Sequence, residues 1–186
     1  EVNAFDQMMI ATRHGNFAVK KGDKLAGTRI IPLVIEEEKM KKVKAQTMEL
    51  TGGKPILELK PFQHKQVGII TTGNEVFHGR IQDTFTPVIV DKLAEFNAEV
   101  TDHVTWDDDD KKVTASILDM IEKGADIVIC TGGMSVDPDD KTPLAIKNTG
   151  ARIVSYGAPV LPGAMFLLAY YDRMEQGKNR RTVIMG

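Results

Sequence analysis

The feature that most constrains the fold is a regular alternation of short apolar segments and amphipathic segments after residue 66. The apolar segments have the length of strands, and the amphipathic ones repeat their apolar residues at helical spacing. The predicted strands are 67–72, 98–104, 127–131 and 152–155. Three helices are predicted: the first starts at Pro87 with Thr86 as N-cap, the second spans 111–123, and the third starts at Thr142 and is ended by Gly150. This alternation predicts an α/β fold, with a mostly parallel sheet between helices in a three-layer αβα arrangement.

The first 60 residues have a different character and predict a small β-rich segment with one helix. The glycine-punctuated stretch 19–27 is typical of a turn or hairpin between short strands. Acidic and then basic residues predict a surface helix within 35–50. The remaining expected elements are a strand at 55–59, a linker at 61–65, and an antiparallel pair at 166–171 and 181–185. Two domains are therefore expected, at 1–60 and 66–186.

The composition excludes several classes of protein. The net charge of −2 and the absence of a long basic run argue against a nucleic-acid partner. No apolar stretch approaches the ~20 residues of a membrane span, so no membrane partner is expected. The single cysteine, Cys130, lies in an apolar run and predicts a buried core residue rather than a disulfide. A cytoplasmic protein is expected. Because the chain starts at Glu1 and stops at Gly186, we also expect a fragment truncated at its C-terminal end.

Three loops follow predicted strands, at the sheet edge where α/β proteins bind ligands. The first loop contains Gly73, which lets the backbone approach a ligand, followed by Asn74 and Glu75 as polar groups. An ordinary strand-to-helix turn remains open for this loop. The second loop is a run of four acids, 107–110. Acids before a helix cap its free N–H groups, which accounts for one or two of the four; a divalent cation such as Mg²⁺ would relieve the repulsion of all of them.

The third loop begins with Gly132 and Gly133 directly after a predicted strand. Paired glycines leave backbone N–H groups free to line an anion site, and Ser135 adds a hydroxyl. The acids Asp137, Asp139 and Asp140 follow in the same loop. Glycines and acids together favour a phosphate held with the help of Mg²⁺, although a long loop without a ligand remains open.

Several other kinds of site are not indicated. The chain has neither a Gly-x-x-x-x-Gly-Lys nor a Gly-x-Gly-x-x-Gly motif. Ser135 lies in no nucleophile-elbow pattern. The histidines are scattered without metal-ligand spacing at positions 14, 64, 78 and 103. A hydrolase triad and a histidine metal site are therefore not expected.

Taken together, the loop motifs resemble the molybdopterin-binding domain. The motifs that carry the resemblance are, in order, 72–75 (Thr-Gly-Asn-Glu), 79–83 (Gly-Arg-Ile-Gln-Asp), 107–108 (Asp-Asp), 131–135 (Thr-Gly-Gly-Met-Ser) with Asp140, and 162–163 (Pro-Gly). This domain occurs in molybdopterin adenylyltransferases, molybdenum insertases, gephyrin and the competence-damage-inducible proteins. The similarity runs from about residue 67 to the end of the chain. The first 60 residues instead resemble the leading segment of stand-alone molybdopterin-binding proteins.

The resemblance implies roles for residues in these loops. It implies that Gly132, Gly133 and Ser135 receive the terminal phosphate of the pterin, and that Asp107 and Asp140 are catalytic and lie near a metal. Glu75 is implied as a third catalytic residue. The remaining implied ligand-binding residues are Thr72, Gly73, Asn74, Asp83, Thr84, Pro162 and Gly163. The implied ligands are molybdopterin, Mg²⁺ and ATP, and the implied assembly is a homodimer or homotrimer.

Departures from the family pattern leave several functions open. The family usually has an acid at the position of Asn74, an asparagine at Phe85 and, in insertases, a glycine at Asp137. The resemblance implies an enzyme of molybdenum cofactor biosynthesis, a transferase that adenylates molybdopterin with Mg-ATP or inserts molybdate. One alternative is a non-catalytic carrier or sensor of molybdopterin. The other is a nucleotide pyrophosphate hydrolase of the competence-damage-inducible type.

Overall fold

The computed structural model describes residue 3 and residues 7–135 and 140–186. Contacts divide the chain into two compact units, Glu1–Lys60 and Pro61–Gly186, which are described separately here. Within the described ranges, no helix combines the length and apolar character needed to cross a membrane.

The first unit is a two-stranded sheet and one helix. Strands β1 (Met8–Thr12) and β2 (Ala26–Ile30) pair antiparallel, with Met8 opposite Ile30. Helix α1 (Glu37–Leu50) forms where acidic and then basic residues predicted it, and it is followed by Gly52 and Gly53 at positive φ. The strand expected at 55–59 is wrong. In the described residues, only β1 and β2 form this unit's sheet, so the backbone at 55–59 has no strand to pair with.

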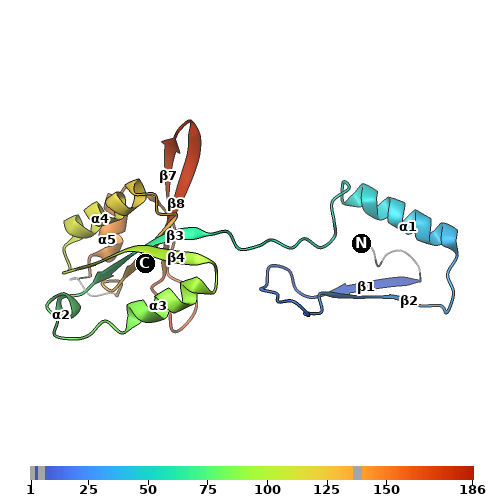
Figure 1. The fold of residues 1–186 in the computed structure, drawn as a ribbon, viewed down its shortest axis with the longest axis horizontal. Coiled ribbons are helices and arrows are strands. Elements are labelled where there is room, and N and C mark those ends of the chain that lie inside the picture. The colour runs from blue at the N-terminus through green and yellow to red at the C-terminus, as the bar shows by residue number, and fades with distance from the viewer. Residues whose placement is uncertain (1–2, 4–6, 136–139) are drawn as a thin grey trace. The chain divides into compact units, whose positions relative to one another are not determined.

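The second unit confirms the predicted α/β fold (Figure 1). Its six strands are β3 (Lys65–Thr72), β4 (Ala98–Trp106), β5 (Ile127–Thr131), β6 (Arg152–Tyr156), β7 (Leu167–Glu175) and β8 (Lys178–Met185). They lie in the order β4-β3-β5-β8-β7-β6. The pairs β4–β3, β3–β5 and β5–β8 are parallel, whereas β7 is antiparallel to both of its neighbours. Strands β3, β4 and β5 therefore end at the same edge.

Helices cover both faces of this sheet. Helix α3 (Phe85–Ala94) lies on one face, and α4 (Asp110–Glu122) and α5 (Thr142–Asn148) lie together on the other (Figure 1). The buried apolar residues of α4 lie on one side of the helix, as predicted: Val113, Ile117, Met120 and Ile121. They pack with Ile70, Val128 and Cys130 in the main core. Burial raises the pKa of the Cys130 thiol to about 12, so this cysteine is an inert core residue.

Close packing between β3 and α4 depends on a glycine. Residues 67–72 are all buried, as expected of a central strand with both faces covered. A Cβ at Gly68 would collide with the Met120 sulfur and lie 3.1 Å from its Cγ. The absence of a side chain at Gly68 therefore lets α4 sit directly on the centre of the sheet.

Several boundaries differ from the sequence prediction by a few residues, and two of the differences have an evident cause. Helix α3 begins at Phe85, with Thr84 as the flanking residue, rather than at Pro87 with Thr86 as N-cap. The reason is that Asp83 accepts hydrogen bonds from the amides of Phe85 and Thr86, at 2.9 and 3.0 Å, and so fixes an earlier start. The hairpin β7–β8 is longer than predicted, because the two-residue turn at Gln176 and Gly177, both at positive φ, joins the strands directly. A short helix, α2 (Asn74–Phe77), was not predicted.

Candidate functional site

The loops after β3, β4 and β5 meet at the carboxyl edge of the sheet. The loop after β3 turns at Gly73, whose φ of 142° lies in the region that favours glycine. Its amide donates to the carbonyl of Trp106 at 3.2 Å, which ties the first loop to the end of β4. Helix α2 then starts at Asn74. These contacts place the polar groups of the first loop beside the acidic second loop.

Within the acidic loop, Asp109 is the N-cap of α4. Its carboxylate accepts hydrogen bonds from the amides of Lys111 and Lys112, at 2.9 and 3.2 Å. The bond from the Lys112 amide, together with that from Lys111, lowers the pKa of Asp109. This acid is therefore engaged in starting the helix.

Asp107 has a different partner. The Nζ of Lys112 donates to both of its carboxylate oxygens, at 3.0 and 3.1 Å. The same ammonium lies 5.6 Å from the ring centre of Trp106 and 5.9 Å from that of Phe77. The protein thus provides its own cation for Asp107 and holds that cation between the carboxylate and two aromatic rings.

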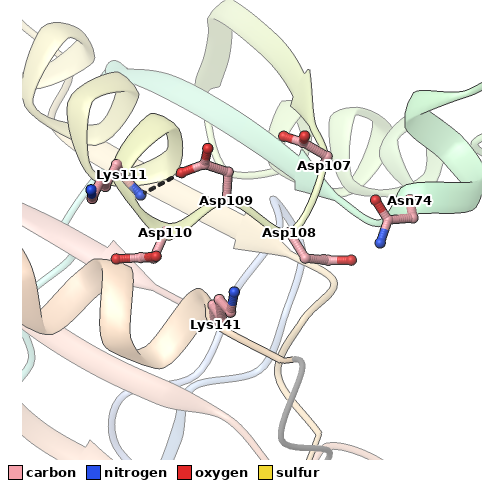
Figure 2. A pocket seen from close by; sticks show the side chains of 7 residues that line it. All are labelled: Asn74, Asp107, Asp108, Asp109, Asp110, Lys111 and Lys141. Carbon is pink, nitrogen blue, oxygen red and sulfur yellow. Dashed lines mark hydrogen bonds between the residues drawn. The ribbon is translucent and has the colours of Figure 1, made fainter.

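The acidic loop borders a hollow of about 490 Å³ (Figure 2). Its lining residues are Asn74, Asp107, Asp108, Asp109, Asp110, Lys111 and Lys141. Asp110 accepts a hydrogen bond from Asn148 at 3.3 Å. Within the described ranges, Asp108 has no hydrogen bond or ion pair, so it is the acid of the run whose carboxylate is free to meet a ligand.

A preformed cation site is not present among the described residues, where no group of three His, Cys, Asp or Glu side chains could hold a metal ion. Asp107, one of the two expected metal residues, is paired with Lys112. Asp140, the other, is half-buried and does not border the hollow. The described side chains alone therefore do not fit a resident Mg²⁺ ion.

The third loop is held tightly against the end of β3. Gly132 and Gly133 have φ values of 85° and 56°, which other residues adopt only with strain. A Cβ at Gly132 would collide with the carbonyl oxygen of Thr72. A Cβ at Gly133 would lie 2.7 Å from the Thr142 hydroxyl and 3.0 Å from the Thr72 hydroxyl. In the described part of the chain, the amides of the two glycines make no hydrogen bond.

Asp83 and Thr84 lie at the start of α3. Besides the two amides, the Asp83 carboxylate accepts hydrogen bonds from the hydroxyls of Thr86 and Thr71. Burial opposes its ionisation, but the bonds from the Thr86 hydroxyl and from the Thr86 and Phe85 amides outweigh that effect and lower the pKa of Asp83 below the usual 3.8. Asp83 thus connects the helix start to the end of β3.

The ionised Asp83 predicts an acid-dependent loss of stability. A carboxyl whose folded pKa is lowered contributes its full stabilisation above about pH 3.8 and loses it as the pH falls through the folded pKa. We expect Asp83→Asn to lower the free energy of unfolding at pH 7 by roughly 0.5–2 kcal/mol, as for a lost helix cap. The difference from wild type should shrink below about pH 4.

Urea unfolding at a series of pH values measures this difference. Asp91→Asn is the matched control, because Asp91 is exposed on the same helix and has no recorded partner in the described residues. If Asp83→Asn and wild type keep the same difference from pH 7 to pH 3, the proposed role of the ionised Asp83 is wrong.

The other expected site residues lie at the same edge but outside the hollow. Glu75 and Ser135 are exposed, and Pro162 and Gly163 are exposed in the loop between β6 and β7. Strand β6 is separated from β5 by two strands, so its loop lies well away from the glycines of the third loop. Asp137 and Asp139 lie outside the described residues. The hollow therefore brings together only Asn74 and Asp107 of the expected set.

Three contributors to this edge were not predicted as site residues: Lys112, Lys141 and Thr142. Asp108 belonged to the expected acidic motif but was given no role of its own. The acid run signalled that one of its members would cap a helix, but not which one. The Thr-Pro pair at the start of α5 signalled a helix start, but not that the Thr142 hydroxyl would contact the glycine loop.

The fold and these loops define an open-sheet α/β protein with a glycine loop after a central strand, at the carboxyl edge of the sheet. Over residues 68–184, the chain matches the family described as the probable molybdopterin binding domain. Since this match spans more than half of the chain, the protein belongs to that family, as the loop motifs predicted.

Solved structures with the same fold include MoaB from Pyrococcus furiosus, described as a tungsten cofactor synthesizing protein. It is 22% identical, with a TM-score of 0.54, over 66% of this chain and 81% of that one. CinA from Thermoplasma acidophilum, described as having unknown function, is 18% identical, with a TM-score of 0.53, over 65% of this chain and 87% of that one. At these identities, the similarity establishes the fold alone.

Among curated proteins, a CinA-like protein from Mycobacterium tuberculosis (strain ATCC 25177 / H37Ra) is 35% identical over 77 residues. The matched region is 41% of this chain and 18% of that protein. A CinA-like protein from Mycolicibacterium gilvum (strain PYR-GCK) is 32% identical over the same shares. The match thus spans less than a fifth of the length of these relatives.

Proposed function

We propose that this protein binds molybdopterin, with its terminal phosphate on the loop of Gly132 and Gly133, and acts in molybdenum cofactor biosynthesis. The observation that carries the proposal is the geometry of that loop. Two successive positive-φ glycines sit at the carboxyl edge with amides that make no hydrogen bond among the described residues. Backbone amides without an acceptor in the protein can bind an anion such as a phosphate. Membership of the molybdopterin-binding family supports this choice of anion.

Four aspartates and two lysines line the hollow, so a ligand with its phosphate on the glycine loop would place a polar, partly cationic body here. Lys111 and Lys141 border the hollow, and Lys141 directly precedes the helix that carries Thr142. Lys112 neutralises Asp107, which lowers the repulsion that the acidic loop would exert on a phosphate. Asp108 and Asn74 then offer an acceptor and an amide for the amino and carbonyl groups of a pterin.

Three finer activities follow from this binding. The protein adenylates molybdopterin, inserts molybdate, or carries the pterin without reaction. In adenylation, a phosphate oxygen of molybdopterin would attack the α-phosphorus of ATP and release pyrophosphate. The Mg²⁺ that accompanies ATP would be part of the substrate. Glu75, exposed at the first loop, is the residue of that loop to which the family resemblance assigns a catalytic role.

A nucleotide pyrophosphate hydrolase is the second candidate. The observation that favours it is the 35% identity to CinA-like proteins over 77 residues. The same glycine loop would hold a phosphate of the dinucleotide. This candidate requires hydrolysis of ADP-ribose, which a molybdopterin carrier or transferase would not perform.

We also propose that the protein is a homo-oligomer. The supporting observation is edge strand β6, on which Ile153, Val154 and Tyr156 are all exposed. Contiguous exposed apolar side chains on an edge strand are typical of a surface that another chain covers.

The test is a titration followed by fluorescence of the single tryptophan, Trp106, which ends β4 next to the hollow. We expect molybdopterin to change this fluorescence saturably and dephosphorylated molybdopterin to bind at least tenfold more weakly, because charge-assisted hydrogen bonds to the phosphate contribute about 1.5–3 kcal/mol. Equal affinity for the two compounds would contradict the assigned phosphate position.

The same samples, incubated with Mg-ATP, separate the activities. Release of pyrophosphate that requires molybdopterin indicates adenylation, and release of AMP from the adenylated pterin that requires molybdate indicates insertion. Binding without either product indicates a carrier. Hydrolysis of ADP-ribose without any binding of molybdopterin would replace the main proposal by the second candidate.

A further inference from the structure

Two buried hydroxyls lie beneath the glycine loop, one on each of the elements that flank it. Thr72 ends β3 and is 6% exposed; Thr142 begins α5 and is 2% exposed. Their Oγ1 atoms are 3.2 Å apart. A second contact, from the Thr72 hydroxyl to the carbonyl of Thr131, spans 3.3 Å. The two hydroxyls therefore join β3, β5 and α5 at the point where the loop leaves the sheet.

The proton of each hydroxyl can be assigned from its acceptors. The Thr142 hydroxyl donates to the carbonyl of Gly132 at 2.9 Å, and this acceptor has no proton of its own. Thr142 can therefore only accept in its contact with Thr72. The single Thr72 proton is claimed in the same way by the Thr131 carbonyl. Two hydroxyl protons thus serve three contacts, and the pair is anchored at one end on the Gly132 carbonyl and at the other on the Thr131 carbonyl.

The glycine loop is held by its carbonyls. Besides the hydroxyl bond to Gly132, the amide of Thr142 donates to the carbonyl of Gly133 at 3.2 Å. Both glycine carbonyls are thus used by one residue, while both glycine amides make no hydrogen bond in the described part of the chain. A carbonyl shares its peptide plane with the amide of the next residue. The Thr142 hydroxyl on the Gly132 carbonyl therefore fixes the Gly133 amide, and the Thr72 hydroxyl on the Thr131 carbonyl fixes the Gly132 amide.

We propose that Thr142, supported by Thr72, is the positioning residue of the phosphate loop: the Thr142 hydroxyl orients the Gly133 amide, the Thr72 hydroxyl orients the Gly132 amide, and together they set the selectivity for a phosphorylated ligand. The inference rests on the proposed function, because it takes molybdopterin as that ligand. Thr142 touches the loop and not the phosphate. Its effect is therefore on the preference for the phosphorylated form and not on contacts with the pterin ring.

The test compares Thr142→Val with Thr142→Ser in the full chain, using molybdopterin and dephosphorylated molybdopterin. Valine keeps the shape of the side chain and removes the donor, whereas serine keeps the donor. We expect Thr142→Val to lose roughly tenfold or more in affinity for molybdopterin and to leave that for the dephosphorylated form within about threefold. Thr142→Ser should retain the preference of the wild type.

Thr149→Val is the matched control. Thr149 ends the same helix, is similarly buried, and donates its hydroxyl to the carbonyl of Ile146 at 2.6 Å, but it does not contact the glycine loop. We expect this variant to lose stability and to keep the full preference for the phosphorylated form. The comparison separates a general loss of stability from a local effect on the loop.

Three results would overturn the inference, and they are distinguishable. If wild type and Thr142→Val prefer the phosphorylated form equally, the positioning role is wrong while the proposed function stands. If Thr149→Val or Thr142→Ser loses the preference as strongly as Thr142→Val, the effect is one of stability or size and not of the hydroxyl. If wild type itself shows no preference, the proposed function fails and the inference fails with it.

Discussion

Gly132→Ala is expected to abolish measurable preference for a phosphorylated ligand and to destabilise the second unit. An alanine Cβ at this position would collide with the backbone oxygen of Thr72 and lie 3.0 Å from the Thr72 hydroxyl. Backbone on a buried strand cannot yield as a flexible side chain can, so the loop itself must move. The positive φ of 85° adds a strain of about 1–2 kcal/mol for a residue with a Cβ.

Gly150→Ala is the control that measures the cost of a positive φ without a collision of the added Cβ. Gly150 has nearly the same φ, 82°, but a Cβ there would meet nothing within 4 Å. Urea unfolding should show a loss of about 1–2 kcal/mol for Gly150→Ala and a larger loss for Gly132→Ala. The preference for the phosphorylated ligand should be lost only in the Gly132 variant. Equal losses of stability and unchanged binding in both variants would mean that the loop is not held as tightly against Thr72 as described.

Ile117→Ala should cause a large loss of global stability. Ile117 is fully buried at the centre of α4, in the core that also contains Ile70 and Val128. Removing a buried isoleucine side chain leaves a cavity and costs about 2–5 kcal/mol. Because α4 also carries the acidic loop at its first turn, we expect the variant to lose affinity for ligand as its folded fraction falls.

Glu122→Ala is the control for this prediction. Glu122 lies on the same helix, is exposed, and has no recorded partner in the described residues. Its replacement should change the free energy of unfolding by no more than about 0.5 kcal/mol. Chemical denaturation of the two variants measures the difference. A loss below about 1 kcal/mol for Ile117→Ala would show that α4 does not pack on the sheet as described.

The fold of the second unit could be predicted from the sequence because buried positions require apolar residues, and these recur at the spacing of strands or helices. A strand covered on both faces must be apolar throughout, as 67–70 and 127–130 are, and a helix on a sheet must be apolar on one side, as α4 is. The segment 55–59 carried the same local signal and is not a strand. Strand formation requires a partner, and nothing local in the sequence indicates whether one is present.

The site was less predictable because neighbouring residues of one type compete for the same roles. Any of the four acids 107–110 could cap α4, and only the path of the chain after Trp106 decides that Asp109 does so. The same path of the chain pairs the Asp107 carboxylate with the Lys112 ammonium and places Asp108, without such a partner, at the hollow. At the start of α3, Thr86 has a side chain suited to an N-cap, but it is the Asp83 carboxylate that accepts the hydrogen bond from the Thr86 amide.

The most direct test of the central claim is a calorimetric titration of the protein with molybdopterin, in parallel for wild type and Gly132→Ala. We expect saturable binding to wild type and at least tenfold weaker binding to the variant, with both proteins shown to be folded by circular dichroism. Saturable binding of equal affinity to both would contradict the assignment of the phosphate to the glycine loop. The absence of binding to folded wild type would contradict the proposed function itself.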